Sequence, residues 1–174
     1  MGINKFLILV VVFTVVFLVI DKEQTVQKVQ KVEKPKVSFY DSIMYDITQK
    51  NVNQIVKSKQ ADIYDKREEL FDATIVAKSE KNSYDTNIVS GKTIIKKGDK
   101  VHLIGSVNLQ LTDGTNVKTE ELFYNTKTKI AKNSIDFVAI RDNDTFHGNT
   151  LYLDAINEEL SAKQTKFRMK VKND

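Results

Sequence analysis

A strict alternation of apolar and polar side chains constrains this chain more than any other feature. It covers residues 101–111, where the apolar odd-numbered positions are Val101, Leu103, Val107, Leu109 and Leu111. Successive side chains of a β-strand point to opposite faces, so these apolar side chains share one face. The Asp113-Gly114 pair that follows is typical of a tight hairpin turn, and a second strand-like run covers residues 116–124. The sequence therefore predicts an antiparallel β-hairpin.

Strand-like runs also fill the rest of residues 37–174. β-Branched residues are abundant and Pro35 is the only proline, a composition that favours strands over helices. The further predicted strands are residues 54–64, 70–77, 87–96, 129–139, 145–154 and 163–172. We therefore expect one all-β, antiparallel domain over residues 37–174.

A loose internal repeat organises these strands. Four segments begin at Ala61, Lys92, Glu120 and Asn149, and each combines a strand, a polar turn and a second strand. The segments recur at about 30 residues, the range typical of repeated supersecondary units. A two-stranded unit cannot bury its apolar face alone, so stacked hairpins that form a continuous groove or a rolled sheet are expected.

The N-terminal apolar run favours a membrane anchor. Residues 6–20 read FLILVVVFTVVFLVI, without a charge between Lys5 and Asp21. Insertion of such a helix is favourable by several kcal/mol on the biological scale. A cleaved signal peptide would need small residues after the run, and residues 17–22 contain none. We expect a retained transmembrane helix over residues 6–20, with residues 1–5 as a short cytoplasmic tail.

Residues 21–36 alternate charged residues with isolated valines and end near Pro35. This composition predicts a periplasmic linker or a juxtamembrane stalk. Val26, Val29 and Val32 recur every three residues, so a short amphipathic helix is the alternative, although valine is a poor helix former.

Few side chains suit catalysis or metal binding. The chain has no cysteine, which excludes disulfides and thiolate metal sites. Its two histidines, His102 and His147, would need carboxylates from distant segments to complete a zinc site. The acidic pairs 68–69, 120–121 and 158–159 are adjacent, so their carboxylates would point to opposite faces of a strand. Glycine-rich nucleotide loops and a nucleophile elbow are missing from the sequence.

We therefore predict no enzymatic activity, no metal and no cofactor. The 27 basic and 23 acidic residues are spread along the chain without a dense basic block, so a nucleic-acid partner is not expected either.

One segment resembles a known family. Residues 101–140 contain, in order, a strand with a G-x-V step at Gly105, the Asp113-Gly114 turn, and a T-x-x-L-x-Y strand at Thr119; residues 146–154 follow with an x-G-x-x-L step at Gly148. This order resembles the LptC family, the membrane-anchored periplasmic subunit of lipopolysaccharide export. The resemblance implies an antiparallel β-jellyroll of the OstA/LptA-like type behind one N-terminal transmembrane helix. LptA and LptD share the jellyroll, and the predicted anchor favours LptC.

The resemblance also implies a function and a place for it. The protein would be a single-pass protein of the bacterial inner membrane, with its C-terminal domain in the periplasm. It would bind lipopolysaccharide in an apolar groove and pass it from the LptBFG ABC transporter to the periplasmic bridge protein LptA. The alternative is a membrane-tethered scaffold with a solid β core that holds protein partners and binds no lipid.

The candidate lipid-binding side chains are the apolar residues expected to point inward. They are Ile94, Leu103, Val107, Leu109, Leu111, Leu122, Ile135, Phe137, Phe146, Leu151, Leu153, Phe167 and Met169. For each of these residues, packing in an ordinary protein core is an equally good interpretation.

The resemblance implies that jellyrolls join edge to edge, which corresponds to β-augmentation between open sheets. The C-terminal edge, with Thr165, Phe167, Met169 and Val171, is expected to face an LptA-like bridge protein. The N-terminal strands, with Phe39, Ile43 and Ile47, and the transmembrane helix are expected to face LptF- and LptG-like subunits.

Overall fold

The computed structural model describes residues 33–49, 52–79, 85–142, 144–157 and 159–168. The predictions of a cytoplasmic tail at residues 1–5 and a transmembrane helix at residues 6–20 lie outside the described residues, as does most of the linker at 21–36. Within the described ranges, no helix is long and apolar enough to cross a membrane.

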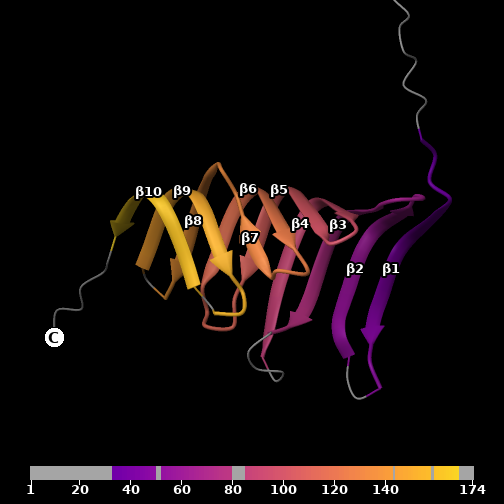
Figure 1. The fold of residues 1–174 in the computed structure, drawn as a ribbon, viewed down its shortest axis with the longest axis horizontal. Helices are drawn as coiled ribbons and strands as arrows, with labels where there is room; N and C mark the ends of the chain where they lie inside the picture. The colour runs from indigo at the N-terminus through magenta and orange to yellow at the C-terminus, as the bar shows by residue number, and fades with distance from the viewer. Residues whose placement is uncertain (1–32, 50–51, 80–84, 143, 158, 169–174) are drawn as a thin grey trace, which may run out of the picture. The chain divides into compact units, whose positions relative to one another are not determined.

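A single ten-stranded sheet contains all the described secondary structure (Figure 1). Its strands are β1 (Val37–Ile47), β2 (Val52–Ile63), β3 (Glu68–Lys78), β4 (Thr86–Lys97), β5 (Lys100–Gln110), β6 (Asn116–Asn125), β7 (Ile130–Lys132), β8 (Asp136–Arg141), β9 (Asp144–Asp154) and β10 (Glu159–Arg168). Sequential strands are neighbours except β7 and β8, which both lie between β6 and β9. All pairs are antiparallel, with β1 and β10 at the two edges. The prediction of an all-β antiparallel domain is confirmed.

The predicted hairpin corresponds to β5 and β6, in which Leu109 pairs with Val117. The single strand predicted at residues 129–139 is wrong. The structure divides it into β7 and β8, which lie end to end between β6 and β9. Residues 133–135 lie outside both strands. At this gap the Leu151 N–H donates to the side-chain oxygen of Asn133, while the Asn133 N–H donates to the Leu151 carbonyl.

A crease crosses the sheet near the middle of the strands. We define it by the non-glycine strand residues with left-handed backbone, which are Asp41 (φ 49°), Asp72 (φ 46°), Ser106 (φ 50°), Thr150 (φ 62°) and Gln164 (φ 49°). The register places Asp41 and Asp72 at the same level, on either side of Lys59. In β5 the crease coincides with a register shift between Ile104 and Val107, as in a β-bulge that bends its strand.

The crease changes which side chains face inward. Buried positions step by three residues across it, from Ser58 to Ala61 in β2 and from Thr119 to Leu122 in β6. In β5 the extra bulge residue makes the step four, from Leu103 to Val107. The predicted odd-numbered face of β5 is therefore preserved, whereas its neighbours do not follow a strict period of two.

The core is one cluster of buried apolar side chains on the inward face of the sheet. Ile94, Leu103 and Leu151 are at most 2% exposed. The described residues contain neither a helix nor a second sheet to cover this face. The sheet must therefore curl around its own apolar face, which agrees with the rolled sheet expected from stacked hairpins.

Candidate ligand-binding interior and sheet edges

The structure brings most of the predicted inward residues together in the core. Eight of them are at most 9% exposed: Ile94, Leu103, Val107, Leu109, Leu122, Phe137, Leu151 and Leu153. Leu111 and Phe146 are partly buried and pack against this cluster. Ile135 is half-buried in the bend between β7 and β8 and is not part of the packed cluster. The side chain of Phe167 and all of Met169 lie outside the described residues.

The interior opens at one end into a cavity of about 620 Å³. We call this the inner cavity. Its apolar lining is Leu111, Ala139, Phe146, Leu153 and Leu160, and the rest of its lining is mostly polar or charged. Leu160 was not among the predicted residues, because the sequence pattern placed the start of the last strand too late, at residue 163. The middle of the interior is filled by side chains, and the apolar surface open to a ligand therefore lies at this end.

Charged side chains surround the mouth of the inner cavity. Arg141 Nη1 lies 3.3 Å from Asp113 Oδ2. Partial burial alone would raise the pKa of Asp113, but the hydrogen bonds from Thr115 and the charge of Arg141 outweigh it and hold this pKa below its ordinary value. The Thr115 N–H donates to Asp113 Oδ1 at 2.9 Å. The mouth thus combines an apolar floor with a charged rim that fixes the β5–β6 turn.

A buried polar clamp holds the interior where β7 and β8 separate. Asn133 is 4% exposed, and its side-chain oxygen accepts the Leu151 N–H at 2.8 Å. Its amide nitrogen donates to Thr119 Oγ1 at 2.9 Å. The Thr119 hydroxyl in turn lies 3.0 Å from the Asp136 carbonyl. This clamp joins β6, β8 and β9 at the gap in the ladder. The sequence did not predict it, because Asn133 stands between the polar residues Lys132 and Ser134 and no local pattern distinguishes it.

Aromatic packing closes the interior beside the clamp. The Phe137 and Phe146 ring centroids are 5.8 Å apart. Phe137 also lies directly against the Gly148 backbone, where an added Cβ would be 2.9 Å from Phe137 Cε1. Glycine at position 148 is therefore required by this close approach.

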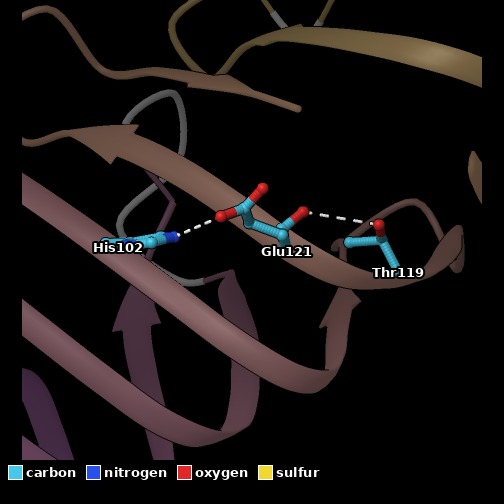
Figure 2. A network of polar contacts seen from close by, with 3 residues as sticks. All are labelled: His102, Thr119 and Glu121. Atoms are coloured by element: carbon cyan, nitrogen blue, oxygen red, sulfur yellow. Dashed lines mark hydrogen bonds and ion pairs between the residues drawn. The ribbon is translucent and has the colours of Figure 1, made fainter. Parts of the chain in front are cut away.

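A polar network links His102 on β5 with Glu121 and the buried Thr119 on β6 (Figure 2). His102 Nε2 is 2.7 Å from Glu121 Oε1, and the Glu121 carbonyl accepts the Thr119 hydroxyl at 3.3 Å. The His102 ring also stacks on Phe123, with centroids 4.1 Å apart. His102 thus has structural partners on the sheet surface. In the part of the chain that the structure describes, no three His, Cys, Asp or Glu side chains gather as a metal site would require.

The two edge strands differ in their surfaces. On β1, Phe39 is 49%, Ile43 53% and Ile47 68% exposed, and the equally exposed Tyr40 and Tyr45 were missed by the sequence pattern. On β10, Thr165 is exposed and Phe167 pairs with Phe146 through the backbone, while Val171 lies outside the described residues.

Comparisons with known proteins bear on this fold. No curated protein sequence matches the chain. Among solved structures, the crystal structure of LptH from Pseudomonas aeruginosa, the LptA homologous periplasmic component of the lipopolysaccharide transport device, aligns with a TM-score of 0.47 and 13% identity, over 79% of this chain and 96% of that one. The family described as lipopolysaccharide-assembly, LptC-related, matches residues 7–160. The chain therefore belongs to the LptC-related family of lipopolysaccharide-assembly proteins.

Proposed function

We propose that this protein receives lipopolysaccharide from an LptBFG-like ABC transporter and passes it to an LptA-like periplasmic bridge. Family membership supports a role in lipopolysaccharide transport. Residues 6–20 would anchor the protein in the bacterial inner membrane by a single span, with residues 37–174 in the periplasm. The transfer requires no covalent chemistry, so the protein would act as a binding protein and not as an enzyme.

The inner cavity is the observation that carries this proposal. Each acyl methylene exposed to water costs about 0.8 kcal/mol, so a carrier must offer the chains an apolar surface. Leu111, Phe146 and Leu160 provide that surface at the open end of the curled sheet. Asp113 and Arg141 line the same cavity, and polar groups of the lipid would lie beside them.

The filled middle of the interior favours a second function, the solid scaffold. Ile94, Leu103 and Leu151 leave almost no accessible surface, as in an ordinary core. The two functions differ at the cavity: transport needs acyl chains beside Phe146, whereas a scaffold needs only protein partners at its edges.

Photocrosslinking tests this difference. A photoreactive amino acid is placed at Leu111, Phe146 or Leu160 of the full chain in detergent, and the sample is irradiated with lipopolysaccharide. We expect an adduct that excess unlabelled lipopolysaccharide removes. A matched probe at Lys57, exposed on β2, should give none. A folded protein without an adduct at any of the three cavity positions would favour the scaffold.

The proposed partner surfaces are the sheet edges. The uncovered edge of β10 would extend into the sheet of an LptA-like protein, and the exposed apolar residues of β1 would contact LptF- and LptG-like subunits. Photocrosslinkers along residues 163–172 that capture no bridge protein, or at Phe39 and Ile43 that capture no transporter subunit, would remove the corresponding contact.

A further inference from the structure

A second and larger cavity, of about 1340 Å³, lies along the crease between β5 and β10. Its exposed lining comes from Ser106, Lys118, Glu120, Asp136, His147 and Lys166. Because these side chains alternate along their strands with the buried Val107, Thr119, Phe137 and Gly148, they belong to the outward face of the sheet. We call this cavity the outer groove.

Three basic side chains form a row along the outer groove. Lys118 pairs with Val138, Val138 with His147, and His147 with Lys166, so all four side chains project from the same face of neighbouring strands. Directly opposed side chains on adjacent strands have Cβ atoms about 5 Å apart. Within the described ranges, Lys118, His147 and Lys166 form neither an ion pair nor a side-chain hydrogen bond.

Two carboxylates, Glu120 and Asp136, line the same groove and balance the charge of the two lysines, but neither forms an ion pair with them in the described part of the chain. Glu120 Oε2 accepts the Ser106 N–H at 3.1 Å, which commits this carboxylate to the bulge of β5. Asn149 Nδ2 donates to Gln164 Oε1 at 2.9 Å, so these two amides form a pair along the crease. The outer groove therefore presents unpaired cations on one side and amide and carboxylate groups on the other. Such a lining suits an anion that also carries hydroxyl groups.

We propose that the outer groove binds the phosphorylated saccharide head of lipopolysaccharide. Lys118 and Lys166 would contact phosphate, while Asn149, Gln164 and Asp136 would contact sugar hydroxyls. This inference rests on the proposed function, because it assigns a place to the polar half of the same ligand.

The position of β10 makes this assignment geometrically consistent. Leu160 lines the inner cavity from β10, and Lys166 lines the outer groove from the same strand. Since β10 is the edge of the sheet, a lipid that crosses this edge has its chains on the inward face and its head on the outward face. No other strand lining the outer groove offers such a passage, because each of the others is paired on both sides.

Calorimetric titration of the full chain in detergent at low ionic strength tests the inference. The probe is a deacylated glucosamine disaccharide carrying its phosphates, compared with the dephosphorylated disaccharide and with inorganic phosphate. The test variant is Lys118→Gln with Lys166→Gln. The matched control is Lys57→Gln with Lys100→Gln, which removes the same charge from exposed positions outside the groove.

We expect the test variant to bind the phosphorylated disaccharide about tenfold more weakly, because it loses two exposed ion pairs between lysine and phosphate. The control variant should bind the phosphorylated disaccharide as tightly as the unmodified chain does. The unmodified chain should bind the dephosphorylated disaccharide about as weakly as the test variant binds the phosphorylated one. Equal losses in both variants would overturn the inference. So would inorganic phosphate that binds as tightly as the disaccharide, since the groove would then be only an anion site.

The photocrosslinking readout separates this inference from the proposed function. The test variant should keep its lipopolysaccharide adduct at Phe146, because the inner cavity is unchanged. If the test variant gives the adduct at Phe146 and its affinity for the disaccharide is unchanged, the outer groove does not bind the saccharide head, while the proposed function stands. The proposed function itself would be overturned only if the unmodified chain gave no adduct at Leu111, Phe146 or Leu160.

Discussion

Replacement of Asn133 by alanine offers the sharpest test of how the interior is held together. The substitution leaves the Leu151 N–H without its 2.8 Å acceptor and removes the donor to Thr119 Oγ1, in surroundings where Asn133 is only 4% exposed. A buried polar group that loses its partner costs about 1–3 kcal/mol. Thr119 keeps its bond to the Asp136 carbonyl, so the largest penalty falls on Leu151. We expect Asn133→Ala to lower the free energy of unfolding by about 2–4 kcal/mol, counting the small void that remains.

Urea unfolding of the full chain in detergent, followed by circular dichroism, measures this effect. With a urea m-value of about 2 kcal/mol/M, the midpoint should fall by roughly 1–2 M. Ser134→Ala, at the exposed neighbouring position, should leave the midpoint unchanged. Asn133→Asp should lower the midpoint at least as far as Asn133→Ala, because it places a carboxylate without a counter-charge among the described residues at a buried position and removes the donor to Thr119. A midpoint for Asn133→Ala within 0.3 M of the unmodified protein, about the error of such a measurement, would refute the clamp.

Two further predictions concern packing and pH. Gly148→Ala should destabilise the protein by about 1–3 kcal/mol in the same assay, since its Cβ would meet the buried Phe137 ring; Gly91→Ala, whose nearest neighbours would be 3.8 Å away, should change stability little. Asp113 and Asp154 have pKa values lowered below the ordinary 3.8, so their contribution to stability is present above that pH and is lost as the pH falls through the lower folded values. Thermal melts should show that Asp113→Asn with Asp154→Asn loses less stability between pH 5 and pH 3 than the unmodified chain; an equal loss would contradict this.

The sequence predicted the strands well because their signal is local. Alternation and the Asp113-Gly114 turn depend only on neighbouring residues, and they located β5 and β6 closely. The division between β7 and β8 could not be predicted in this way. Asn133 stands between Lys132 and Ser134, so no local pattern distinguishes it, and its partners Thr119 and Leu151 are distant in sequence.

The sequence predicted the apolar lining of the inner cavity but not the lining of the outer groove, again because only local signals can be read from it. Apolar lining residues such as Leu111, Phe146 and Leu153 follow from the inward pattern of single strands. The basic row was missed, because Lys118, His147 and Lys166 are ordinary surface residues in sequence and become neighbours only through the pairing of β6, β8, β9 and β10.

The crease explains how one sheet can carry both surfaces. A left-handed conformation costs about 1–3 kcal/mol at a residue other than glycine, and more at a β-branched one such as Thr150. In β9 and β10 this conformation is supported by side chains, since Asn149 bonds both the Thr150 hydroxyl and Gln164. The resulting bend turns the apolar face inward around the core and aligns the polar residues of successive strands outside it. The edge strand β10 therefore contributes Leu160 to the inner cavity on one face and Lys166 to the outer groove on the other.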